Sequence, residues 1–376
     1  MTTIGMGPWA TQMLGDMGAD VIKVETSDGD IFRHVTPQRH RGMSHAFLNL
    51  NRNKRSVVLN LKTDEGREAM LRLIQGADVF VSNVRPASLQ RLGLDYESLR
   101  PANPRLIYCG CYGYSESGPY AGRASVDDTI QAACSMASFQ SERSGAPRYV
   151  KTAAADKVCS LFVAGSIAMA LYARERTGLG QAIEVPMFEC MVAFMMPEHL
   201  GGLTFEPPEG PAGYARILDP HRKPFRTKDG YIGVVPYNDL QWRRFFELAG
   251  RAELCDDARF RTQTDRSRNI TVLYSFVEET LAHRTTAEWT ALLQKADIPF
   301  SPVNSVDDLL KDAHLRAIGF WRDIAHPTEG RLRMPGIPVS FSRTPGSIRR
   351  HAPNVGEHTE EVLREAGQKR PRRPKY

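Results

Sequence analysis

Hydrophobic residues in the first third of the chain follow two different spacings. Short runs of apolar or β-branched residues, typical of buried strands, occur at 21–24, 56–61, 79–82 and 106–109. Apolar residues at helical spacing lie between them, and the clearest such segment begins at Thr63, a preferred helix cap, and ends at Gly76. Because strands alternate with helices, we predict an α/β fold with a parallel sheet covered by helices.

The pattern changes near residue 200. Residues 206–211 are rich in Pro, Gly and Glu and are typical of a linker. Beyond them, amphipathic helices are predicted at 242–249, 270–282 and 287–296, and a glycine-turned strand signal lies at 226–234. Thr285 and Glu288 have the spacing of a capping box. The pattern therefore predicts a second, smaller α+β unit.

Residues 154–184 carry the most chemical information. A single carboxylate, Asp156, precedes an apolar stretch at 158–172 that predicts a buried helix, and Arg174 and Arg176 follow it. The free N–H groups and the dipole at a helix N-terminus stabilise an anion there. Asp156 could therefore be a preorganised nucleophile, or it could be an ordinary N-terminal cap. This segment alone leaves both interpretations open.

Composition excludes several classes of protein. The chain has 376 residues and a net charge of +6, but five of its basic residues lie in the last ten positions, GQKRPRRPKY. A short basic, Pro-rich tail is typical of a solvated, disordered end, so nucleic-acid binding is not indicated. No signal-peptide pattern and no run of about 18 apolar residues is evident, which predicts a cytoplasmic protein without a membrane partner.

The six cysteines form neither a CxxC pair nor a Cys/His ligand set, so no metal site is expected. Cys109 and Cys111 lie two residues apart after an apolar strand and share one face of it. We expect them to be buried, reduced thiols.

A series of motifs spans more than 300 residues. In order, the chain contains GPWATQMLGDMGADVIKVE, NRNKRSVVLNLKTDEG, VSNVRPASLQRLGLDYESLRPANPRLIYC, GYSESGPYAGR, DDTIQAA, ADKV, ARERTGLGQ, RKPFRTKDGYIGV, DIPFSPVNSVDDLLKDAHL and APNVGEHTEEVL. Their joint order resembles the class III CoA-transferases, the family that includes formyl-CoA and carnitine CoA-transferases. The resemblance implies transfer of CoA between carboxylic acids, with Asp156 as the nucleophile that forms a mixed anhydride and then an aspartyl-CoA thioester.

The resemblance also implies an architecture. It predicts a large Rossmann-like CoA-binding domain in residues 1–200, a small domain in 201–310, and a return to the large domain with the basic tail in 311–376. Two ring-like chains would interlock in an obligate homodimer. No metal or prosthetic group would be bound permanently, because coenzyme A and acyl-CoA are the substrates.

By the same resemblance, five segments would contact CoA. A loop before a helix N-terminus would bind anions or pantetheine amides, and arginines, lysine, amides and tyrosines would bind the nucleotide and the pantetheine arm. The residues are Ile4, Gly5, Met6, Arg33, Asn53, Lys54, Arg55, Asn83, Val84, Arg85, Arg91, Tyr112 and Tyr114.

Two positions depart from the family pattern. Met1 falls where the first strand of the family should end, which implies either a late start or a sheet that lacks one central strand. Tyr112 stands where some members have a lysine near the nucleotide, so one phosphate contact would be lost.

Three alternatives stay open. α-Methylacyl-CoA racemases share the fold, but their His-Asp pair is here Val126-Asp127, and valine cannot move a proton. Gly5, Gly7 and Ala10, with Glu25 about 20 residues later, fit a dinucleotide-binding fingerprint, although Pro8 offers no N–H to a pyrophosphate. A non-catalytic CoA-binding protein is the third.

Overall fold

The computed structural model describes residues 1–141 and 145–367. The chain divides into two compact units, which we call unit 1 (residues 1–195 and 316 onward) and unit 2 (residues 196–315). The predicted domain boundaries were 200/201 and 310/311. The tail from residue 368, which was expected to be a solvated end, lies outside the described residues.

Unit 1 confirms the α/β class with parallel sheets. β1 (Val21–Glu25) pairs in parallel with β2 (Lys54–Val58), and β4 (Ile107–Tyr112) pairs in parallel with both β3 (Val79–Ser82) and β5 (Gln181–Pro186). The parallel strands thus belong to two separate sheets of two and three strands. Residues 1–3 lie beside both sheets, because Lys23 of β1 binds the Thr2 carbonyl and Asn83, just after β3, binds Thr3.

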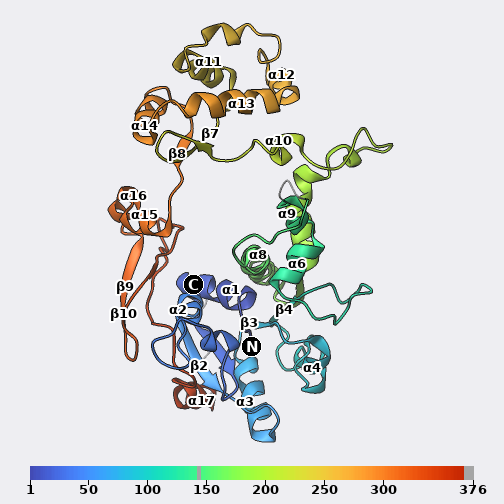
Figure 1. Ribbon diagram of the computed structural model, residues 1–376. Coiled ribbons are helices and arrows are strands. Elements are labelled where there is room, and N and C mark those ends of the chain that lie inside the picture. Colours follow the sequence, from blue (N-terminus) through green and yellow to red (C-terminus); the bar gives the residue numbers. More distant parts are fainter. Residues whose placement is uncertain (142–144, 368–376) are drawn as a thin grey trace. The chain divides into compact units, whose positions relative to one another are not determined.

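The helices of unit 1 follow the strands in α/β order. They are α1 (Met6–Asp16), α2 (His45–Leu50), α3 (Asp64–Gln75), α4 (Pro86–Arg91), α5 (Tyr96–Leu99), α6 (Asp127–Ala133), α7 (Met136–Phe139), α8 (Ala154–Thr177), α9 (Met187–His199, which runs past the division at 195/196) and α17 (Thr359–Gly367), with the 3-10 turn η1 (Ile31–His34). As expected, the Thr63 hydroxyl caps α3 by accepting the Gly66 N–H. α17, the last described helix, packs beside α3 and β2 (Figure 1).

α8 differs from its prediction as a buried helix. Its inner face (Ala155, Cys159, Val163, Ile167) belongs to the core that includes α1 and β4, but Leu161, Phe162, Met169 and Tyr172 are exposed, Met169 by 73%. α8 also has the length and composition to cross a membrane, since its most apolar 18-residue window has a mean hydropathy of 1.5 and is 33% buried. The expectation that no such run occurs is therefore wrong, although core helices of soluble proteins pass the same test.

Unit 2 is the predicted α+β unit. An antiparallel sheet joins β7 (Tyr231–Val234) to β6 (Phe225–Arg226) and β8 (Phe300–Pro302). Its helical elements are η2 (Gly201–Thr204), α10 (Ala215–Leu218), α11 (Asp239–Leu248), η3 (Ala252–Cys255), α12 (Gln263–Arg268), α13 (Ile270–Leu281), α14 (Thr286–Lys295) and α15 (Val306–Lys311). The capping box of Thr285 and Glu288 begins α14 as predicted. The chain then returns to unit 1. α16 (Ala313–Ala317) runs across the division at 315/316, and the antiparallel pair β9 (Trp321–His326) and β10 (Gly330–Pro335) belongs to unit 1.

A buried ion pair links β1 to the segment after it. The Arg33 guanidinium, 0% exposed, donates to both carboxylate oxygens of Glu25 at 2.9 and 2.7 Å and lies 3.6 Å from the Phe47 ring centre. Glu25 also accepts the Ser56 hydroxyl. Burial raises the pKa of Glu25, but Arg33, Lys23 and Ser56 outweigh it and hold that pKa below its usual 4.5.

We predict that Glu25→Gln lowers the free energy of unfolding by about 3–5 kcal/mol at pH 7, because it leaves a buried guanidinium without its counter-charge. Urea unfolding would measure this loss. The double variant Glu25→Leu/Arg33→Met, which removes both charges, should lose less. Since the folded-state pKa is depressed, the wild-type advantage should be full above pH 4.5 and decline as the pH falls through the folded-state pKa. A single variant as stable as the double variant would contradict this role.

Candidate active site

Asp156 is the third residue of α8 and does not cap it. The N-cap residue is Ala153, whose side chain makes no capping bond. The cap comes from another helix, because Asp127, the first residue of α6, accepts the Asp156 backbone N–H at 2.9 Å. The Gln131 amide fixes the second oxygen of Asp127 at 2.6 Å. The capping-only interpretation of Asp156 is therefore wrong, and its carboxylate is left for another role.

The Asp156 carboxylate lies against the N-terminus of α1. It accepts the Met6 N–H, and a Cβ built on Gly5, the N-cap of α1, would lie 2.5 Å from its Oδ2 atom. Any side chain at position 5 would therefore collide with the carboxylate. The Ser160 hydroxyl, one turn along α8, donates to the Met6 carbonyl at 2.7 Å and ties the two helices together at this point. The positive end of the α1 dipole thus faces an anion.

Burial and charge make this carboxyl group unusual. The Asp156 residue is 8% exposed, and burial together with the negative charge of Asp127 raises its pKa to about 6, against the opposing Met6 N–H. At neutral pH the group is mostly ionised but poorly solvated. A carboxylate in this state needs no base to act as a nucleophile.

Asp156 opens into a cavity of about 410 Å³, within the usual range for a small-molecule site. The residues around it belong to unit 1 and come from the chain start, the loops after β3 and β4, α6, α8 and α9. They are Thr3, Ile4, Met6, Asn83, Arg85, Pro86, Cys111, Tyr112, Gly113, Tyr114, Glu116, Gly122, Arg123, Ala124, Ser125, Val126, Asp127, Thr129, Asp156 and Met187.

Half of the predicted site residues meet at this cavity. Ile4, Met6, Asn83, Arg85, Tyr112, Tyr114 and Asp156 line it, and Gly5 touches Asp156. Val84 packs instead against a core cluster, and Arg91 donates to Ser88 on the surface of α4. Burial raises the pKa of Tyr112 far above its usual value, so this tyrosine is neutral.

The structure does not bring Arg33, Asn53, Lys54 or Arg55 to the cavity lining. Arg33 pairs with Glu25, and the Lys54 ammonium donates to the Pro8 and Leu50 carbonyls and to Asn51. Asn53 binds Asp16 and the Ser347 carbonyl, and Arg55 forms ion pairs with Asp20, Glu361 and Glu365. These contacts hold unit 1 together, and the part of these residues in CoA binding stays a prediction.

Two residues at the cavity were missed as site residues. Asp127 was considered only as half of a racemase pair, although two adjacent carboxylates at a helix start are a recognisable signal. Arg123 lies 5.7 Å from the Tyr114 ring centre and 5.2 Å from that of Tyr120. Within the described part of the chain, neither Arg123 nor Arg85 forms an ion pair with a carboxylate. Both arginines are thus available to a ligand anion.

The dinucleotide-binding alternative conflicts with these contacts. Glu25, which would bind a ribose, has its oxygens taken by Arg33, Ser56 and the Asp30 N–H. Gly5 and Gly7, which would approach a pyrophosphate, face Asp156 and Thr2 at contact distance. Residues 1–141 and 145–367 contain no group of three or more His, Cys, Asp or Glu that could hold a metal ion.

Known proteins match almost the whole chain. Residues 1–359 match the family described as CoA-transferase family III. The succinyl-CoA:glutarate CoA-transferase of Mus musculus is 32% identical over 366 residues, 97% of this chain and 84% of the relative. The succinate–glutarate CoA-transferase of Agrobacterium fabrum is 35% identical and covers 96% and 92%. The crystal structure of a CAIB/BAIF family protein from Brucella suis is 33% identical, covers 97% of both chains and has a TM-score of 0.80.

We predict that Asp156→Asn stabilises the fold at pH 8. Because the folded-state pKa of Asp156 is raised to about 6, ionisation opposes folding as the pH rises from about 3.8 through 6. The variant should therefore gain on the order of 2–3 kcal/mol above pH 7 and nothing below pH 3.5. Urea unfolding at both pH values measures this, and Asp128→Asn, at an exposed position of α6, controls for the loss of one charge. A gain that is equal at both pH values would refute it.

Proposed function

This chain belongs to CoA-transferase family III, and we propose that it transfers CoA from an acyl-CoA donor to a carboxylic acid through covalent intermediates on Asp156. One observation carries the proposal. An ionised carboxylate with a raised pKa opens into a cavity large enough for the end of a pantetheine arm and an acid.

The steps balance without water or an external base. An oxygen of Asp156 attacks the thioester carbonyl, and the C–S bond breaks. CoA leaves as a thiolate, and the acyl group stays on Asp156 as a mixed anhydride. The thiolate then attacks the aspartyl carbonyl, and the donor acid departs as a carboxylate. An acceptor carboxylate attacks the resulting aspartyl-CoA thioester, and the thiolate finally attacks the acyl carbon of the second anhydride and frees Asp156. We propose that the Met6 N–H, which donates to the Asp156 carboxylate, stabilises negative charge on the aspartyl oxygen during these steps.

Two arginines support binding of CoA at this cavity. Arg85 and Arg123 lie on its wall, and Arg123 is flanked by Tyr114 and Tyr120. Phosphate groups are preferred partners of guanidinium groups that have no carboxylate partner of their own. We propose that these arginines bind the phosphates while Ile4, Gly5 and Met6 contact the thioester end of pantetheine.

We propose short dicarboxylic acids as the organic substrates. The names of the mouse and Agrobacterium relatives pair succinate or succinyl-CoA with glutarate. A cavity of about 410 Å³ accommodates the thioester end of an acyl-CoA together with an acid of this size.

We further propose that the chain works as an interlocked homodimer in the cytoplasm. The exposed residues Leu161, Phe162, Met169 and Tyr172 give α8 an apolar face of the kind that a second copy covers. All six cysteines are free, as is usual in a reducing compartment.

We predict that Asp156→Ala abolishes CoA transfer while the affinity for CoA, measured by calorimetry, changes less than about threefold, because the carboxylate attacks the thioester but does not bind the nucleotide. With succinyl-CoA, hydroxylamine should mark the wild-type peptide containing Asp156, as a hydroxamate detected by mass spectrometry. Wild type with hydroxylamine but no acyl-CoA is the control. Turnover by the alanine variant would rule out the nucleophile assignment.

We predict that wild type sediments at twice its chain mass of 42.0 kDa, and that Leu161→Glu/Met169→Glu lowers this mass or precipitates the protein, because it places two charges in an apolar contact. Analytical ultracentrifugation measures the mass. Leu71→Glu, at an exposed apolar position of α3, is the matched control and should remain dimeric. A monomeric wild type would overturn the dimer proposal.

A further inference from the structure

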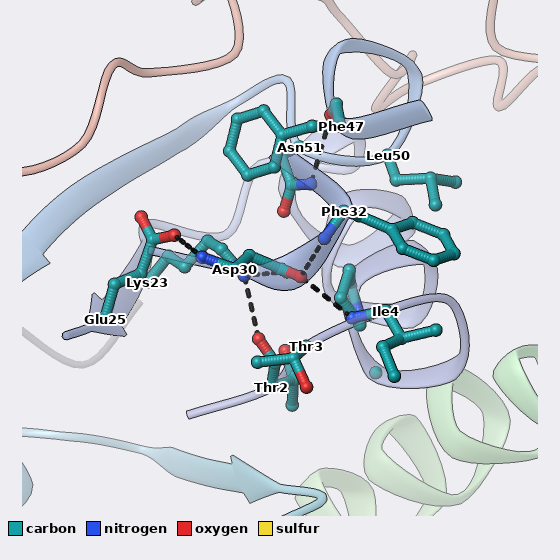
Figure 2. A network of polar contacts seen from close by, with 12 residues as sticks. Thr2, Thr3, Ile4, Lys23, Glu25, Asp30, Phe32, Phe47, Leu50 and Asn51 are labelled. Atoms are coloured by element: carbon teal, nitrogen blue, oxygen red, sulfur yellow. Dashed lines mark hydrogen bonds and ion pairs between the residues drawn. The ribbon is translucent and has the colours of Figure 1, made fainter. Parts of the chain in front are cut away.

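The backbone from Thr2 to Met6, which we call the cradle, is held by side chains of unit 1. The Lys23 ammonium donates to the Thr2 carbonyl at 2.8 Å, and the Asn83 amide bridges the N–H and the carbonyl of Thr3 at 3.0 and 2.9 Å. The Ile4 N–H donates to Asp30 Oδ1 at 3.1 Å, and Figure 2 shows Asp30 between Lys23, Ile4 and Phe32. Three successive residues are thus fixed just before Gly5.

Ile4 has a backbone conformation that β-branched residues rarely adopt. Its φ of 69° lies in the left-handed region, where steric conflict costs roughly 1–3 kcal/mol. The turn at Ile4 leads directly into Gly5 and Met6, whose backbone contacts the Asp156 carboxylate. Because a strained residue persists only when its surroundings determine it, the groups that hold Ile4 also determine where the Met6 N–H points.

Asp30 is the most completely fixed of these groups. Its residue is 0% exposed, its Oδ1 atom accepts the Ile4 and Phe32 N–H groups, and its Oδ2 atom pairs with Lys23 at 2.8 Å. The Asp30 backbone N–H donates to Glu25, which is itself held by Arg33. Asp30 lies outside the cavity lining and does not touch Asp156, so any effect it has on Asp156 passes through the cradle.

We propose that Asp30 is a positioning residue for the nucleophile: by holding the Ile4 N–H it keeps the cradle in the conformation that aims the Met6 N–H at the Asp156 carboxylate. This inference rests on the proposed function in one respect, which is the role of Asp156. Without the Asp30 acceptor, Ile4 relaxes toward ordinary backbone angles, and Asp156 loses its hydrogen bond from α1. The carboxylate is then less ionised at a given pH, and the anhydride step loses a preorganised donor.

The groups that face Asp156 allow the effect to be read from a pH profile. They are the Asp127 carboxylate on α6, the Met6 N–H on α1 and the Cys159 thiol on α8. Among them the Met6 N–H lowers the pKa of Asp156, whereas burial and Asp127 raise it. Loss of the Met6 bond should therefore move the acidic limb of kcat/KM to higher pH, whereas general destabilisation would not.

Two double variants separate the hydrogen bond from the buried charge. Asp30→Asn/Lys23→Met removes the ion pair but retains an oxygen that can accept the Ile4 N–H. Asp30→Ala/Lys23→Met removes the same charges and also the acceptor. We expect Asp30→Asn/Lys23→Met, the asparagine pair, to retain kcat within about threefold of wild type. Asp30→Ala/Lys23→Met, the alanine pair, should lose on the order of 10- to 100-fold in kcat, the size expected when a hydrogen bond to a charged group is lost. The acidic limb should rise by about one pH unit in the alanine pair only.

The unfolding midpoint and the CoA affinity of both variants should also be measured. The kcat values are then compared only between variants that are folded and bind CoA. Equal kcat values and equal acidic limbs in the two folded variants would overturn the positioning role. If the alanine pair does not fold, Asp30→Val/Lys23→Met, which also removes both charges and the acceptor but fills more of the space, takes its place in the same comparison. Absence of a hydroxylamine adduct in wild type would sink the proposed function instead, so the two failures can be told apart.

Discussion

The contact between the Asp156 carboxylate and the N-terminus of α1 is the constraint on which the rest of the site depends. A buried charge is costly unless fixed donors or positive potential replace its water. At Asp156 the cost of burying the charge is only partly compensated. The Met6 N–H stabilises the carboxylate, whereas the nearby negative charge of Asp127 destabilises it. The result is a buried carboxyl group with a pKa of about 6, which is mostly ionised at neutral pH. Gly5 has no side chain because the carboxylate occupies the space where a Cβ would be.

Segments with a local signal could be predicted from the sequence. The first four strands of unit 1, the Thr63 cap and the capping box at α14 depend on neighbouring residues, and they appear within three residues of their predicted bounds or at the predicted cap. Asp156 was singled out as a candidate nucleophile from its place before an apolar helix together with the family resemblance of the motifs around it.

Contacts between distant segments could not be predicted in the same way. Basic residues such as Arg33, Lys54 and Arg55 are typical of a phosphate-binding site. In the fold, however, each of them binds carboxylates or carbonyls from other segments of the chain. Asp127 caps a helix that begins 27 residues later in the chain, a distance at which no spacing rule applies. The long apolar stretch of α8 predicted a buried helix, but part of that helix is exposed. An apolar sequence indicates that a surface is unfavourable in water, but it does not identify the surface that covers it.

The position of α17 has a consequence for biosynthesis. This last described helix packs on α3 and β2, and its Glu361 and Glu365 neutralise the buried Arg55 of β2. The ribosome therefore has to deliver all of unit 2 before unit 1 can be completed, at a rate of about 5–20 residues per second. During that interval Arg55 lacks two of its partners and part of the apolar surface of α3 stays uncovered. We therefore expect a chain that stops before α17 to leave Arg55 without Glu361 and Glu365 and α3 partly uncovered, so that unit 1 stays incomplete.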